Sequence, residues 1–112
     1  MITMLAIALA AADAEGIRRL LHTAVVTVVD SGGATGDAPT GVLHGPDAAA
    51  AALQHSAVSA AVTTASVNAA PGIVIRHQGR ITAVVCANTR AGQIVELWII
   101  RNPEKLRRWD RS

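Results

Sequence analysis

The sequence contains no Phe and no Tyr, and only Trp98 and Trp109 remain of the large aromatic residue types. Hydrophobic residues nevertheless make up 51% of its 112 residues, and Ala and Val supply most of them. The core must therefore be built from small aliphatic side chains. Without tyrosine, a pocket has no phenolic acid or oxyanion donor, and it cannot hold a flat ligand between Phe or Tyr rings. This composition excludes tyrosine-dependent enzyme sites.

Cysteine is almost absent as well, since Cys86 is the only one. A single cysteine excludes an internal disulfide, a cysteine-based zinc cluster and a CxxC redox pair, and it is compatible with the cytoplasm, where we expect the protein. Four histidines are spread along the chain, but no two are four residues apart and no HExxH motif occurs. We therefore expect no metal site and no cofactor.

The chain also lacks a basic residue before its first apolar run, Met1 to Ala12. A secretory signal would need that basic start, and the run is too short to span a membrane, so we interpret it as a buried, Ala-rich helix. The segment Arg101 to Ser112 holds five basic and two acidic residues, a net charge of +3, and the rest carries −1. A short solvated basic tail is far commoner than a nucleic-acid site, and we expect no direct nucleic-acid binding.

The pattern of residue types predicts one α+β domain over residues 1–112. Good helix formers fill 2–12, and Asp13 is placed to cap a second short helix that has Ile17, Leu20 and Leu21 on its apolar stripe. A β-branched run predicts a strand over 24–29. The later predicted elements are a short strand over Gly41–Gly45, a helix from Pro46 to about Ser56, strands over Val62–Ala70, Ile73–His77, Ile81–Thr89 and Ile94–Arg101, and a last helical turn capped by Asn102 with Pro103 first.

This order favours a cone-shaped, curved and mostly antiparallel sheet with the N-terminal helices packed on it. A cone of this kind encloses a pocket. Alternation along the last strand places Glu96 and Trp98 on one face with Ile94 and Ile100, and Val95, Leu97, Ile99 and Arg101 on the other. The alternation of side chains along the strand does not show which of the two faces is inside.

Four polar or aromatic residues on strands or strand ends are candidates for the pocket lining: His44, Arg76, Glu96 and Trp98. Glu96 stands between Val95 and Leu97, so inside a dry pocket it would act as a general base. The alternative places Glu96 on the solvent face, paired with an arginine of a neighbouring strand. No complete set of catalytic residues is evident.

Four segments, in order, resemble the SnoaL-like C-terminal extension of extracytoplasmic-function sigma factors. They are Asp30-Ser31-Gly32-Gly33, Val67-Asn68-Ala69-Ala70-Pro71-Gly72, Gly92-Gln93-Ile94 and Arg101-Asn102-Pro103-Glu104-Lys105-Leu106. Arg80 and its strand, between the second and third segments, belong to the same resemblance. Ser31 and Ala34 replace a Gly and a Lys of the family's loop. Three of the motifs also have a structural interpretation: Asp30 as a turn-former, Pro71 and Gly72 as a tight hairpin, and Asn102 to Leu106 as a helix cap.

The resemblance implies the SnoaL-like or cystatin-like roll that nuclear transport factor 2, ketosteroid isomerases and the polyketide cyclase SnoaL share. It implies a non-catalytic regulatory domain in transcription, with sigma-factor domains or RNA polymerase as partners, and we also expect a homodimer formed through one face of the sheet. The same fold hosts enzymes, so the alternative is an isomerase- or polyketide-cyclase-like enzyme with a small apolar ligand in the cone.

Overall fold

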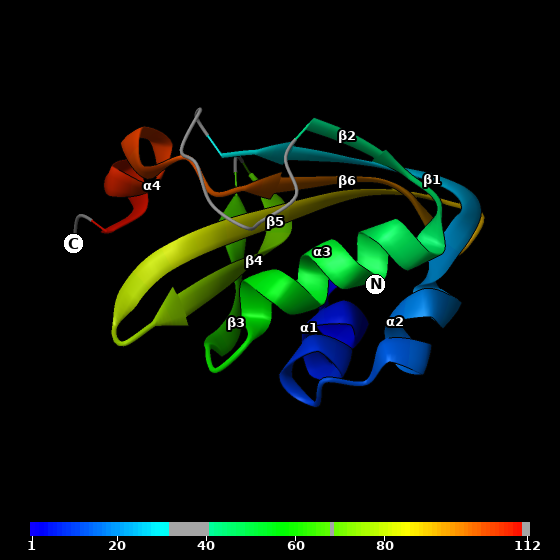
Figure 1. Cartoon of the computed structure of the whole chain (residues 1–112), viewed down its shortest axis with the longest axis horizontal. Helices are drawn as coiled ribbons and strands as arrows, with labels where there is room; N and C mark the ends of the chain where they lie inside the picture. Colours follow the sequence, from blue (N-terminus) through cyan, green and yellow to red (C-terminus); the bar gives the residue numbers. More distant parts are fainter. Residues whose placement is uncertain (32–40, 68, 111–112) are drawn as a thin grey trace.

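The computed structural model describes residues 1–31, 41–67 and 69–110, which form helices packed on a curved sheet. Figure 1 shows the sheet arching over α1 (Ile2–Ala10), α2 (Ala14–Leu20) and α3 (Pro46–Ala57), with α4 (Pro103–Asp110) near one end of the strands. The strands are β1 (Leu21–Asp30), β2 (Gly41–His44), β3 (Ala61–Val67), β4 (Ala70–His77), β5 (Arg80–Arg90) and β6 (Gln93–Ile100).

The strands form one sheet in the order β2-β1-β6-β5-β4-β3. Of the neighbouring pairs among these described strands, β1 and β6 run parallel, while the other four pairs are antiparallel. Because β1 and β6 are parallel, their carboxyl ends meet at the same edge of the sheet. The predicted α+β class and the mostly antiparallel, curved sheet are confirmed.

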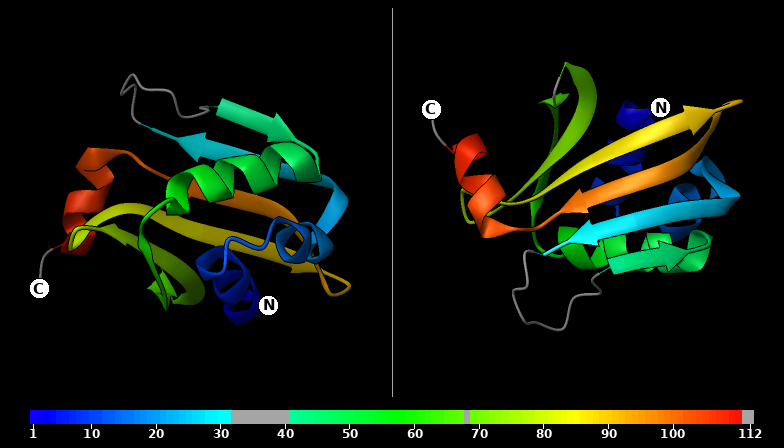
Figure 2. Two further views of the ribbon diagram at one scale, coloured as in Figure 1. Left: turned by 60° about the horizontal axis from the view of Figure 1, so that its bottom comes forward. Right: turned by 90° about the horizontal axis from the view of Figure 1, so that it is seen from above.

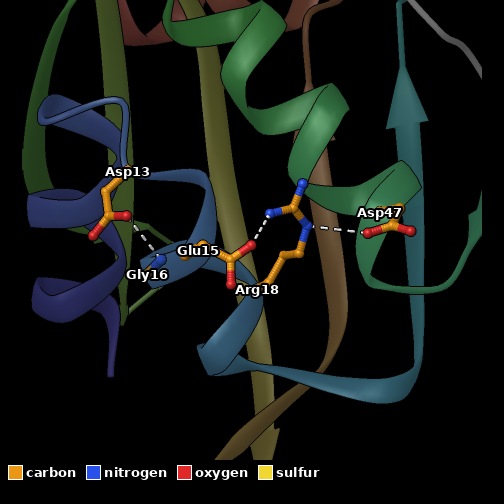
Figure 3. A network of polar contacts seen from close by, with 5 residues as sticks. All are labelled: Asp13, Glu15, Gly16, Arg18 and Asp47. Carbon is orange, nitrogen blue, oxygen red and sulfur yellow. Dashed lines mark hydrogen bonds and ion pairs between the residues drawn. The ribbon is translucent and has the colours of Figure 1, made fainter.

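Polar contacts cap α2 and join it to α3, as Figure 3 shows. The Asp13 side chain accepts a hydrogen bond of 3.0 Å from the Gly16 backbone N–H, which is the predicted cap of α2. The Arg18 guanidinium then bonds both Glu15 in its own helix, at 2.6 Å, and Asp47 at the start of α3, at 3.0 Å. This network joins α2 to α3 on the surface of the helical layer.

The main core fills the space between the helices and the inner face of the sheet. Its fully buried members include Leu5 of α1, Leu53 of α3, and Ile73, Leu97 and Ile99 from the strands. As the composition predicts, these side chains are aliphatic. Among the described residues the buried polar side chains are those of Thr27, Ser31 and Ser56, so no ionisable group is buried in this core.

A second, smaller core lies on the outer face of the sheet, where α4 packs. Leu106 of α4 is buried there against Val67, Val74, Ile81 and Val84. In the view from above in Figure 2, α4 lies at one end of the strands while the helices α1 to α3 lie behind the sheet. The outer face is therefore covered by a helix at one end only, among the described elements.

The hairpin between β3 and β4 differs from the sequence prediction. We expected a strand over Val62–Ala70 and a tight turn at Pro71 and Gly72, but both residues lie inside β4, and Val67 pairs with Ala70. The chain reverses before Ala70, and Ala69 adopts the left-handed region at φ 65°. Gly72 is required for packing, because a Cβ there would lie 2.4 Å from Val67 Cγ2 and 3.1 Å from the Val85 carbonyl oxygen.

Two further predictions about faces and ends are wrong. Leu21 begins β1 instead of ending the stripe of α2, because the helix stops at Leu20. Ile94 is fully buried in the main core with Leu97 and Ile99, although simple alternation places it with Glu96. The reason is a break in register on both sides of β6, between Leu21 and Val26 of β1 and between Asn88 and Thr89 of β5.

Candidate functional site

Three of the four predicted pocket residues lie together on the outer face of the sheet. His44 pairs with Val26, Val26 pairs with Glu96, and Glu96 pairs with Asn88, so these residues form one row across four strands. Residues paired across strands point to the same face. In the next row, Trp98 lies between Val28 and Cys86, and Val28 is flanked by Val42.

We call the surface formed by Val26, Val28, Val42, His44, Glu96 and Trp98 the open face. Trp98 is 37% exposed and Val42 57% exposed, which are large values for apolar side chains. The open face is therefore apolar in the middle, and His44, Glu96 and Asn88 give it a polar border. It belongs to the part of the sheet that no described helix covers (Figure 2).

Glu96 does not line the core. Its Oε1 accepts a hydrogen bond of 3.0 Å from the Asn88 Nδ2 on the neighbouring strand, and its side chain is only half-buried. This is close to the alternative that we considered, a solvent-side glutamate with a cross-strand partner, except that the partner is an amide instead of an arginine. A general base needs a substrate space beside it, and the core side of β6 is occupied by Leu97 and Ile99.

Arg76 lies apart from the other three residues. It is exposed at the far end of β4, where it pairs with Ala61 and Ile81 near the β4–β5 turn. The structure therefore brings together His44, Glu96 and Trp98 but not Arg76, and it places the three on the outside of the sheet instead of in an enclosed cone.

The inner face contains one polar group that the sequence analysis did not single out. Thr27 is fully buried between Leu43 and Leu97, and its Oγ1 has no hydrogen-bond partner within the described part of the chain. Alternation along β1 could have placed it inside, since Val25 and Val29 flank it at steps of two. Thr27 gave no further signal in the sequence, because a threonine is common in a valine-rich strand.

Three of the family-motif residues, Asp30, Asn102 and Lys105, lie at the carboxyl ends of β1 and β6, whereas Pro71 and Gly72 lie in β4. Lys105 Nζ lies 2.5 Å from Asp30 Oδ2, although 75 residues separate them, and the Arg101 backbone N–H donates to the Asp30 carbonyl oxygen at 2.7 Å. Asn102 caps α4 through Glu104 N–H at 3.0 Å, as predicted. Asp30 thus anchors α4 and does not merely form a local turn, whereas Gly32, Gly33 and Asn68 lie outside the described residues.

The remaining chemistry of the described residues is limited. Cys86 is half-buried beside Trp98, and burial raises the pKa of its thiol, so it is held protonated. No three His, Cys, Asp or Glu side chains in residues 1–31, 41–67 and 69–110 approach closely enough to hold a metal ion. Within the same ranges, none of the helices has the length and apolar character that a bilayer crossing needs.

Comparisons with protein-family models and with curated proteins give no match. Several solved structures are similar. SigJ, an extracytoplasmic function sigma factor of Mycobacterium tuberculosis, is 27% identical with a TM-score of 0.66, over 92% of this chain and 42% of SigJ. IdmH, a proposed polyketide cyclase from Streptomyces antibioticus, is 17% identical with a TM-score of 0.65, over 96% of this chain and 93% of IdmH. An NTF2-like protein of unknown function from Cytophaga hutchinsonii is 13% identical with a TM-score of 0.60, over 93% of this chain and 88% of that protein.

The chain therefore has the SnoaL-like, nuclear transport factor 2-like fold that the sequence resemblance implied. The resemblance to the extracytoplasmic-function sigma factors is confirmed by the similarity to SigJ, of which the chain spans less than half the length. Since both a sigma factor and a proposed cyclase are similar, the fold by itself does not decide between regulation and catalysis.

Proposed function

We propose that this chain is a non-catalytic regulatory or interaction domain, located in the cytoplasm, that binds its partners through the open face. The observation that carries the proposal is the exposure of Trp98 and Val42 on a part of the sheet that no described helix covers. Contiguous exposed apolar surface with a polar border is typical of protein interfaces. Tryptophan is also among the residue types that contribute most to binding energy at such surfaces.

The first partner that we propose is a second copy of the chain. A symmetric dimer would place Trp98 of one copy against the valines of the other, because an isologous interface uses the same patch twice. The second partner is a sigma-factor domain or RNA polymerase, with a role in transcription regulation. Support for this partner comes from the 27% identity to SigJ over 92% of this chain.

The test is to measure binding of the purified chain to itself, to extracytoplasmic-function sigma domains and to RNA polymerase from the same organism. Trp98→Ala, in the open face, is expected to weaken each interaction that uses this face. Met4→Ala is the matched control, because Met4 is a 57% exposed apolar residue on α1 in the helical layer. If neither sigma domains nor polymerase bind, the role in transcription is wrong. If binding occurs and Trp98→Ala leaves it unchanged, the open face is the wrong surface.

A second candidate function is binding or isomerising a small apolar ligand on the inner side of the sheet. Thr27 favours it, because a fully buried hydroxyl without a partner is costly unless something bonds it. The similarity to IdmH is consistent with this function. A ligand that co-purifies with the chain and is lost in Thr27→Val would support the enzyme-like candidate. Glu96→Gln should leave that ligand bound, because Glu96 lies on the opposite face.

A further inference from the structure

We infer that the cleft between the start of β5 and α4 binds a small organic oxyanion, a carboxylate or a phosphate attached to a short apolar group. The cleft has a volume of about 450 Å³ and is lined by Arg80, Ile81 and Thr82 of β5 and by Arg101, Leu106 and Arg107 around α4. This site is separate from the open face and does not rest on the proposed function.

The cleft has a surplus of positive charge. Among the described residues around it, Lys105 is paired with Asp30, and Arg107 with Glu104 at 2.9 Å. Arg80 and Arg101 form no ion pair with any described residue. Four basic groups against two carboxylates leave a local charge of +2, and the two unpaired guanidiniums come from different elements. Unpaired guanidiniums of this kind are suited to bind carboxylate or phosphate oxygens with two parallel hydrogen bonds.

The floor of the cleft is apolar. Ile81 and Leu106 are 6% and 5% exposed and belong to the outer core, so they present only the edge of a packed surface to the cleft. A bare ion would gain nothing from this floor, whereas an anion that carries a ring or a short alkyl group would cover it and remove apolar surface from water. The combination of a charged rim and an apolar floor points to an amphiphilic anion.

The backbone around the cleft is held in place. The Arg101 backbone N–H donates to the Asp30 carbonyl at 2.7 Å, and Asn102 caps the first turn of α4. Leu106 fixes the far side of that turn in the outer core. The other wall, at the start of β5, is held by the pairing of β5 with β4. Binding therefore requires ordering of the arginine side chains but not of the backbone, which keeps the entropic cost low.

The experiment is an NMR titration of the isotopically labelled full chain at low ionic strength with phenyl phosphate, benzoate and benzyl alcohol. We expect the two anions to shift backbone amides of residues 80–82 and 101–107, and the uncharged alcohol to leave them unchanged. Whichever anion binds more tightly identifies the preferred oxyanion. Inorganic phosphate should bind more weakly than phenyl phosphate, because it leaves the floor of Ile81 and Leu106 uncovered.

Arg80→Gln and Arg101→Gln should each weaken binding by roughly tenfold, because each removes charge-assisted hydrogen bonds. Arg90→Gln is the control, since Arg90 is an exposed arginine at the opposite end of the same strand, and it should change the affinity by less than about twofold. The inference is overturned if no shift occurs with either anion, if benzyl alcohol binds equally well, or if all three variants lose affinity alike.

Discussion

Trp98→Ala probes the open face most sharply, and its expected magnitude follows from the exposure of the indole. A tryptophan has on the order of 250 Å² of surface. The exposed 37% therefore amounts to roughly 90 Å², or about 2.3 kcal/mol at ~25 cal/mol per Å² if a partner covers it fully. A symmetric dimer contains two such residues, so the upper bound is roughly 4.6 kcal/mol.

Only part of this bound appears as affinity, because association also has entropic and desolvation costs. Taking about half, we expect Trp98→Ala to weaken dimerisation by about 2 kcal/mol, or roughly 30-fold in the dissociation constant. Sedimentation velocity over a range of protein concentrations measures that constant. Circular dichroism of the same samples shows whether the fold is retained, since the covered part of the indole also packs within the monomer.

Met4→Ala provides the comparison on the opposite side of the molecule. Met4 is more exposed than Trp98, at 57%, yet it lies on α1 and should leave the dissociation constant unchanged. The reasoning about the open face is refuted if Trp98→Ala folds normally and dimerises like the parent chain. If Met4→Ala alone abolishes the dimer, the dimer interface lies on the helical layer and not on the open face.

Three predictions concern the packing of the sheet. Thr27→Val should raise the free energy of unfolding by about 1 kcal/mol in urea titrations, because it removes a buried hydroxyl that has no partner; a clear loss of stability would mean that this hydroxyl is bonded in solution. Gly72→Ala should lower the free energy of unfolding by about 1–3 kcal/mol, because the added Cβ would clash with Val67 and the backbone of β5. An unchanged free energy of unfolding would show that the hairpin can shift to accommodate the added Cβ without cost. Burial raises the pKa of the Cys86 thiol, so iodoacetamide should alkylate Cys86 more slowly than free cysteine at pH 8 and faster as the pH rises; equal rates at pH 8 would contradict its burial.

Much of the architecture could be predicted because its signals are local. Asp13 and Asn102 cap the helices that the sequence assigns to them, and Pro46 begins α3. The β-branched runs formed strands because such side chains suit a pleated surface. Turn-forming residues between the runs then indicated the number of strands.

The errors lie where distant parts of the chain decide the local structure. Ile94 faces the core because register breaks on both neighbouring strands shift the alternation of β6, and a single strand shows no sign of them. Gly72 was interpreted as a turn residue, yet its small size is required by Val67 and Val85 across two strand pairs. The ion pair of Asp30 with Lys105 depends on the parallel pairing of β1 and β6.

The candidate site was predicted only in part. Glu96 and Trp98 share a face, as the alternation along β6 indicates. The alternation does not show that this face is the outer face of the sheet. That outcome depends on which side α1 to α3 cover, which is a property of the whole fold (Figure 1). The arginine cleft was missed because Arg80 and Arg101 are 21 residues apart and meet only through the pairing of β5 with β6.

Native mass spectrometry of the purified chain tests the central claim most directly, because it reports the number of copies and any retained small molecule in one spectrum. An interaction domain that uses the open face should appear as a dimer at twice the 11.5 kDa chain mass, without a bound ligand, and Trp98→Ala should appear as a folded monomer. A chain that stays monomeric at high concentration and carries a small apolar molecule would contradict the claim and favour the ligand-binding alternative.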